Sequence, residues 1–287
     1  MSKSKKRLVI LSVVFLLFLS LVIFTAWGNL TVKTTVIDIK DDNIPSGFNN
    51  FKIAQISDFH NTELGADNSK IIKILEKQQP DIIVITGDFV DSSHTDLNIA
   101  LSFAKRAKEI APCYYVSGNH ETWLVSEQMG FKDFKHLFIE AGITVLENES
   151  KILERNGDKI NLIGINDPSF EGNEMFSPDG GIAEYYIESA GAKDGYKILL
   201  SHRPELFETY VRENMNLVFS GHAHGGQIRL PFIGGLIAPN QGLFPKYDAG
   251  LYGKDDTKMI VSRGLGNSVI PLRFNNRPEV VIAILRK

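Results

Sequence analysis

Short apolar runs alternate with amphipathic stretches along most of the chain, and this alternation constrains the fold more than any other feature. Runs of strand length and composition predict β-strands at residues 30–40, 51–56, 81–86, 113–116, 160–165, 196–200, 217–220, 259–262 and 280–285. Helical periodicity predicts helices at residues 69–79, 97–110 and 126–141. The tripeptide NGD at residues 156–158 predicts a hairpin turn. Strands that alternate with helices indicate crossover connections and a layered α/β fold.

Polar motifs directly follow five of these predicted strands. They read SDFH (57–60), GDFVD (87–91), GNHE (118–121), SHRPE (201–205) and GHAHGG (221–226). Ligands bind at the carboxyl ends of strands in open α/β sheets, so we expect the five segments to meet in one crevice. Gly87, Gly118 and Gly221 suit these positions, because a glycine lets the backbone turn sharply and approach an ion.

The side chains of these motifs form the donor set of a metal site. Two carboxylates, one amide oxygen and four imidazoles are too many for one tetrahedral zinc and suit two divalent metals that share a bridging carboxylate. The candidates are Asp58, His60, Asp88, Asn119, His202, His222 and His224. Five of the seven histidines of the chain fall in the motifs, and only His94 and His136 lie elsewhere.

Each motif taken alone has a simpler explanation. Asp58 or Asp88 could cap a following helix, and His202 could be a hydrogen-bonded core residue. Isolated D-x-H and H-x-H patterns are also common on protein surfaces. All five segments occupy the same structural position, however, so we expect a shared site, with no part in it for His94 or His136.

The ordered motifs D-x-H, G-D-x-x-D, G-N-H-E, a histidine after a strand and G-H-x-H resemble those of the calcineurin-like metallophosphoesterase superfamily. The chain also resembles its bacterial, membrane-associated branch in the stretches GHAHGGQIRLP (221–231) and SRGLGNSVIPLRFNNRPEVVIAIL (262–285). The resemblance implies a four-layer α/β/β/α sandwich, whereas periodicity alone indicates only an α/β fold.

The resemblance also implies how the donors divide between two metals. One metal would be held by Asp58, His60 and His224. The other would be held by Asn119, His202 and His222, with Asp88 as the bridge between them. Because His222 and His224 are alternate residues, they can reach different ions from an extended backbone.

His120 matches the family position that stabilises or protonates the leaving oxygen. Glu121 would orient the His120 ring, and Asp91 would support the metal ligands from behind. Two divalent cations, with Mn, Fe and Zn equally suited, would lower the pKa of a shared water and yield a hydroxide that attacks phosphorus in line. No covalent enzyme intermediate is needed.

The second motif departs from that of the family's protein phosphatases, which continue it as G-D-x-V-D-R-G with the arginine on the phosphate. Ser92 and Ser93 stand in that place here, which favours a phosphodiester or pyrophosphate substrate over a phosphoprotein. Candidate replacements for the arginine are Arg203, Arg263, Arg273 and Arg277, each of which could instead form a structural salt bridge.

An uncharged apolar run occupies residues 8–27 and follows the basic run KSKKR. About 20 apolar residues cross a bilayer as a helix, and a signal-peptide core has only roughly 7–15. We therefore divide the chain into a basic flank (1–7), a single-pass transmembrane anchor (8–27), a linker and first strand (28–50) and a metallophosphoesterase domain (51–287). The positive-inside rule predicts that the flank stays in the cytoplasm and that the domain lies outside it. A cleaved signal peptide is the alternative.

Composition excludes little else. The formal net charge of -3 provides no overall attraction to nucleic acid, so we expect no nucleic-acid partner. A single cysteine, Cys113, rules out an internal disulfide and leaves the redox compartment and the oligomeric state open.

A long apolar segment rich in glycine and proline, residues 228–253, follows the last metal motif. Long loops are often functional, so we expect a wall or lid whose Phe232, Ile237 and Phe244 face lipid, with a packed return loop as the alternative. The expected function is hydrolysis of a phosphodiester or pyrophosphate, with lipid-linked and cell-envelope phosphates as candidate substrates. The alternatives are a phosphomonoesterase and a non-catalytic metal-dependent binder of phosphorylated envelope ligands.

Overall fold

The computed structural model describes residues 2–91, 93, 95–124, 130–172, 180–267 and 271–287. Ser92, His94 and the first part of the helix expected at residues 126–141 therefore lie outside the described residues.

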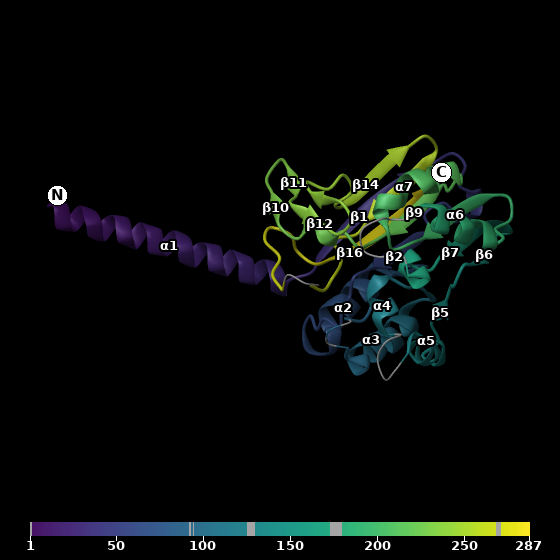
Figure 1. Cartoon of the computed structure of the whole chain (residues 1–287), viewed down its shortest axis with the longest axis horizontal. Coiled ribbons are helices and arrows are strands. Elements are labelled where there is room, and N and C mark those ends of the chain that lie inside the picture. Colours follow the sequence, from purple (N-terminus) through teal and green to yellow (C-terminus); the bar gives the residue numbers. More distant parts are fainter. Residues whose placement is uncertain (1, 92, 94, 125–129, 173–179, 268–270) are drawn as a thin grey trace.

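Two six-stranded mixed sheets form the centre of the molecule (Figure 1). The first has the order β1 (Lys33–Lys40), β16 (Glu279–Arg286), β2 (Lys52–Ile56), β3 (Ile82–Thr86), β4 (Cys113–Val116) and β5 (Thr144–Val145). The second has the order β14 (Gly250–Lys254), β15 (Thr257–Val261), β9 (Leu217–Ser220), β8 (Tyr196–Leu200), β7 (Asp158–Gly164) and β6 (Glu149–Arg155). The expected strands are confirmed, and the NGD turn joins the antiparallel pair β6–β7.

Helices cover the outer face of each sheet. The first sheet packs against α2 (Ser69–Gln78), α3 (Leu97–Ile110) and α5 (Phe131–Glu140). The second packs against α6 (Gly180–Ser189) and α7 (Phe207–Arg212). The four-layer α/β/β/α sandwich is confirmed. The sequence patterns did not indicate α6 or α7, because α6 starts with two glycines, which are poor helix formers, and α7 has only six residues.

Three apolar clusters hold the layers together, and strand periodicity assigns residues to them. Ile83 and Ile85 of β3 point to the helices, whereas Ile82 and Val84 of the same strand point to the second sheet. This alternation explains why β3 is buried along its whole length and reads as a continuous apolar run.

The carboxyl ends of the central strands of both sheets meet at one edge. Strands β2, β3 and β4 run parallel in the first sheet, and β8 and β9 run parallel in the second. The buried Gln55 joins the sheets near this edge, where its Nε2 donates to Thr86 Oγ1 and to the Ser220 carbonyl, each at 2.9 Å. The polar motifs that follow the strands are therefore brought together.

The N-terminal helix α1 (Lys3–Leu30) projects from the domain as a single long rod (Figure 1). It has 28 residues, none of which is buried, and is long and apolar enough to cross a membrane. The helix includes the basic residues 3–7 as well as the expected span 8–27. Its last turns contact the domain: the Asn29 side chain exchanges two hydrogen bonds with the backbone of Arg273, at 2.7 and 3.0 Å.

Phe138 tests the packing of the helical layer on the first sheet. Its buried ring contacts Phe89, Tyr115 and Phe134 with centroid separations of 4.4 to 5.2 Å. Phe138→Ala is expected to lower the free energy of unfolding of the domain by about 3–5 kcal/mol, because it removes these contacts and leaves a cavity. Urea unfolding of the full chain in detergent, followed by near-UV circular dichroism, measures the change.

The adjacent half-exposed Ile139 provides the matched control on the same helix. Ile139→Ala is expected to change stability by less than about 0.5 kcal/mol. Equal effects of the two substitutions would contradict this packing.

Candidate metal centre

The candidate metal ligands stand on five loops, each directly after a strand. Asp58 and His60 follow β2, Asp88 follows β3, and Asn119 opens the short helix α4 (Asn119–Trp123) after β4. In the second sheet, His202 follows β8, and His222 and His224 follow β9. The structure brings all five loops to the shared edge of the two sheets.

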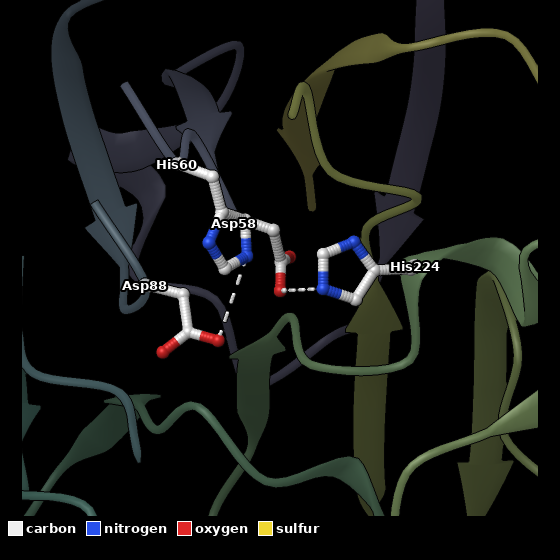
Figure 2. A group of neighbouring side chains, drawn as sticks. All are labelled: Asp58, His60, Asp88 and His224. Atoms are coloured by element: carbon white, nitrogen blue, oxygen red, sulfur yellow. Dashed lines mark ion pairs between the residues drawn. The ribbon is translucent and has the colours of Figure 1, made fainter. Parts of the chain in front are cut away.

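One group of donors consists of Asp58, His60, Asp88 and His224. One ligand atom from each of these buried residues lies within 4.8 Å of the ligand atoms of the other three. Figure 2 shows the two imidazoles beside the two carboxylates. His60 Nε2 lies 3.7 Å from Asp88 Oδ2, and His224 Nε2 lies 3.5 Å from Asp58 Oδ1.

A second group consists of Asp88, His202 and His222 and is gathered in the same way. His202 Nε2 lies 3.0 Å from Asp88 Oδ2, and His222 Nδ1 lies 3.2 Å from His202 Nε2. Asp88 belongs to both groups, which is the position that a bridging carboxylate needs.

Hydrogen-bond partners surround the imidazoles of the second group. His202 Nδ1 lies 2.8 Å from the Thr86 carbonyl, which can only accept, so this nitrogen carries a proton and Nε2 is the nitrogen that would bind a metal. His222 Nε2 lies 2.9 Å from Asn240 Oδ1 and 3.2 Å from Arg203 Nη1, and His222 Nδ1 faces His202. His202 Nε2 and His222 Nδ1 face each other beside the Asp88 carboxylate, where a metal ion or a proton on His202 can lie between them.

Several buried polar atoms of the site have no hydrogen-bond partner. They are Asp58 Oδ2, Asn119 Oδ1 and both ring nitrogens of His60. A buried polar atom without a partner is unfavourable by about 1–3 kcal/mol, so native structures rarely leave one unsatisfied. The mixed nitrogen and oxygen donors match the preferences of Mn, Fe and Zn. These residues therefore fit divalent metal ions.

The site controls the protonation of its imidazoles. Burial lowers the pKa of His222 and of His224 well below the ordinary value, so both rings are neutral and able to coordinate. Burial also opposes charge on His202, but the Asp88 charge and its hydrogen bond raise the pKa of His202 to about 10. Asp88 in turn has a pKa well below its ordinary value, because the neighbouring histidines outweigh burial.

The backbone is strained at five of the candidate ligands. Asp58, His60, Asp88, His222 and His224 all have φ between 46° and 64°. This left-handed conformation is unfavourable by about 1–3 kcal/mol for residues other than glycine and concentrates at functional sites. A Cβ at Gly87, which precedes Asp88, would lie only 2.5 Å from His202 Nδ1. The loop backbones therefore adopt unfavourable conformations that bring the candidate ligands close together.

Glu121 holds two of these loops, those after β3 and β4, in place through their backbone. Its two carboxylate oxygens accept hydrogen bonds from the amides of Asp88, Phe89, Val90 and Gly118, at 2.6 to 3.2 Å. Burial, together with the Asp88 charge, raises the pKa of Glu121 to about 7. We expected Glu121 to orient the His120 ring. In the structure, backbone amides occupy both carboxylate oxygens of Glu121 instead.

His120 and Asp91 lie beside the first group of donors. The His120 ring stands 4.5 Å from the His60 ring, centroid to centroid, and its amide donates to Asp88 Oδ1 at 2.9 Å. Asp91 Oδ2 lies 3.6 Å from His60 Nδ1, and this contact holds the pKa of Asp91 below its usual range. Burial lowers the pKa of His120.

Asn240 and Asp167 lie beside the site and were not predicted from the sequence, whereas Arg273 was predicted as a candidate phosphate ligand. Asn240 contacts His222, and the fully buried Asp167 accepts two hydrogen bonds from Arg203, at 2.6 and 2.9 Å. The buried Arg273 places Nη2 3.4 Å from His224 Nδ1. Asn240 and Asp167 belong to none of the five motifs, so their contacts with the site appear only in the folded chain. Arg203, a candidate phosphate ligand, is committed to Asp167.

The domain matches a known family over more than half of the chain. The model of the calcineurin-like phosphoesterase family matches residues 51–226, which include all the candidate ligands. The chain belongs to the calcineurin-like phosphoesterase family, and it is a metal-dependent hydrolase of phosphoric esters.

Several relatives are similar over most of their length. The uncharacterized metallophosphoesterase YkuE of Bacillus subtilis is 33% identical, over 89% of this chain and 86% of its own. The phosphodiesterase YaeI of Escherichia coli is 29% identical over 81% of each chain. A transmembrane protein with a metallophosphoesterase domain from Danio rerio is 28% identical, over 89% of this chain and 57% of its own.

Among solved structures, TT1561 of Thermus thermophilus superposes with a TM-score of 0.50 at 14% identity, over 75% of this chain and 89% of that one. The likeness supports the fold alone.

Asp88→Asn tests the sharing of one carboxylate by both donor groups. The amide keeps the shape but loses the negative charge and one acceptor, so metal content is expected to fall at both positions, by about 10-fold or more in affinity. Elemental analysis of the purified full chain measures the metal per chain.

His136→Ala is the control, because His136 lies exposed on α5 and pairs only with Glu140 among the ion pairs of the described residues. Loss of about half the metal in Asp88→Asn would contradict sharing, since Asp88 would then serve one position.

Asp167→Asn tests the buried ion pair behind the site. The substitution removes the closer of two carboxylate partners of the buried Arg203, with only Glu205 left at 3.5 Å, and is expected to lower the free energy of unfolding by about 3 kcal/mol. Glu154→Gln, at an exposed pair with Lys159, is expected to change it by less than about 1 kcal/mol.

The same pair predicts a pH dependence. Although burial raises it, the Arg203 charge holds the pKa of Asp167 below its ordinary value of 3.8. Because the folded-state pKa is the lower one, the stabilisation is complete above that ordinary value and is lost as pH falls through the folded-state pKa. Urea unfolding between pH 7 and acid pH should show a smaller loss in Asp167→Asn than in the native chain.

Proposed function

We propose that this protein is a membrane-anchored hydrolase that cleaves a phosphodiester or pyrophosphate bond with two divalent metal ions. The observation that carries the proposal is the sharing of Asp88 between two separate donor groups. Asp58, His60 and His224 would hold one ion, and Asn119, His202 and His222 would hold the other.

Two bound cations would neutralise phosphate charge and lower the pKa of a bound water. The residues of the chain prepare the site for them. The Thr86 carbonyl and the Asn240 side chain hold the rings of His202 and His222, and Glu121 fixes the loops that carry Asp88 and Asn119. Because these groups are already in place, little reorganisation is needed when substrate arrives.

His120 would serve the leaving oxygen. Two contacts support this role: its ring lies 4.5 Å from the His60 ring, and its amide donates to Asp88 Oδ1. A proton or hydrogen bond from His120 would stabilise the charge that develops on the departing oxygen.

The preference for a diester is supported by two features. Ser93 stands near the position at which related protein phosphatases carry a phosphate-binding arginine, and it donates to Asp91 at 2.8 and 2.6 Å. The nearby Arg203 already donates to Asp167 and Asn240. A doubly charged monoester would lack the extra cation that such an arginine provides.

The apolar helix α1 would anchor the protein as a single span. Its basic end would stay in the cytoplasm, which places the catalytic domain on the outer side, where lipid-linked and cell-envelope phosphates are accessible. The similar Danio rerio protein is named a transmembrane protein, which supports an anchor in this chain.

Turnover of bis(p-nitrophenyl) phosphate by the full chain in detergent tests the activity. We expect release of nitrophenol with Mn, Fe or Zn and none after chelation. No turnover by folded, metal-loaded protein would favour the non-catalytic binder, and faster turnover of p-nitrophenyl phosphate would favour a phosphomonoesterase.

His120→Asn separates catalysis from metal binding. Turnover of the diester is expected to fall by about 100-fold to 10,000-fold, because the leaving oxygen loses its donor, while metal content stays at the native level. His136→Ala is again the control and keeps native turnover. Loss of metal in His120→Asn would instead assign His120 to the metal ligands.

A further inference from the structure

The segment that follows the metal histidines contains two short hairpins instead of a structureless lid. Strands β10 (Arg229–Leu230) and β11 (Gly234–Gly235) form the first, and β12 (Ile237–Ala238) and β13 (Gly242–Leu243) form the second. Both leave large apolar side chains in water. This apolar hairpin surface consists of Phe232, Ile233, Ile237, Leu243 and Phe244.

The concentration of this surface distinguishes it from scattered exposed residues. Outside α1, the described residues expose few large apolar side chains, and five of them fall within 13 consecutive positions of the hairpins. Phe232 and Phe244 also have φ of 66° and 54°. Bulky residues rarely adopt this left-handed conformation, so the turns present these two rings outward against a backbone preference.

Fixed contacts join the hairpins to the end of α1. The Phe24 ring of α1 meets the Phe274 ring edge-on at 6.1 Å, and the Arg277 guanidinium lies over the Trp27 ring at 4.5 Å. Phe274 is in turn bound to the first hairpin, because the Arg229 amide donates a hydrogen bond to the Phe274 carbonyl at 3.0 Å. Figure 1 shows β10, β11 and β12 on the side of the domain from which α1 projects.

These contacts set the depth of the hairpins relative to a bilayer. Tryptophan and arginine near the end of a membrane span sit at the headgroup level. A span that ends near Trp27 therefore places Phe274 and the first hairpin beside the headgroups of the same leaflet. Because the apolar hairpin surface is joined to the end of α1, a bilayer around α1 would lie next to it. Lipid is therefore the partner that these contacts favour.

We propose that the apolar hairpin surface inserts into the outer leaflet of the membrane that holds α1. This inference rests on the proposed anchor but not on the proposed chemistry. The second hairpin also joins the membrane to the metal centre, because Asn240 between its strands contacts His222 at 2.9 Å. Insertion would hold the site at the lipid surface and favour substrates whose phosphate lies in the headgroup layer.

Depth-dependent fluorescence quenching tests the insertion in the full chain. The variants Phe232→Cys and Phe244→Cys are each labelled with an environment-sensitive nitrobenzoxadiazole fluorophore and reconstituted in phosphatidylcholine vesicles. The emission is compared with and without lipid that carries a doxyl quencher high on the acyl chain. The native chain is labelled in parallel, because its one thiol, Cys113, is buried. Tyr185→Cys is the matched control, an exposed aromatic position on α6 at the far side of the domain (Figure 1).

We expect doxyl lipid to reduce the emission of the labels at 232 and 244 and to leave the label at 185 unchanged. Equal emission with and without doxyl lipid at both hairpin positions would overturn insertion. Burial of these labels that grows with protein concentration in doxyl-free vesicles would also overturn it, in favour of a second copy of the chain.

Two measurements on the same vesicles keep this inference apart from the proposed function. Retention of the chain after alkaline carbonate extraction reports the anchor, and release of the chain would contradict both the anchor and the insertion. Hydrolysis of bis(p-nitrophenyl) phosphate reports the chemistry, and we expect native turnover in both labelled hairpin variants. Absence of turnover by the metal-loaded native chain would overturn the proposed chemistry and would leave the inferred insertion unaffected.

Discussion

A buried carboxylate shared by two sets of imidazoles is the constraint on which the structure depends. Asp88 has almost no solvent exposure, yet His60 and His202 both direct nitrogens toward its Oδ2. A buried anion is tolerated only where positive charge and hydrogen bonds compensate it. Metal ions provide that charge, and in a metal-free chain the raised pKa of His202 lets a proton take part of their place.

The layered fold meets this constraint through the position of its strand ends. Parallel strands in two facing sheets deliver five loops to one edge, and Gln55 joins the sheets directly beneath them. Glu121 then binds the amides of two loops, and the helix that carries it holds His120. The apolar core between the sheets makes the edge rigid enough to hold ligand residues in left-handed conformations.

The anchor helix and the metal centre belong to one continuous set of contacts. Asn29 binds the backbone of Arg273, and the Arg273 guanidinium lies against His224. A single residue, Arg273, therefore links the end of the N-terminal helix to a candidate metal ligand. If α1 is the proposed anchor, this short path would hold the metal centre close to the membrane surface.

The sequence by itself determined the α/β alternation, the apolar helix and the donor residues, because strand period, span length and ligand chemistry are local properties. It also indicated that Asp88 follows a strand beside the other donors. The family resemblance already implied that Asp88 bridges the two donor sets. Only the tertiary structure decided which groups contact the rings of His202 and His222 and that Glu121 holds backbone instead of the His120 ring. These depend on Thr86, Asn240 and other partners distant in the chain, and no local pattern encodes a contact that forms only when separate segments pack together.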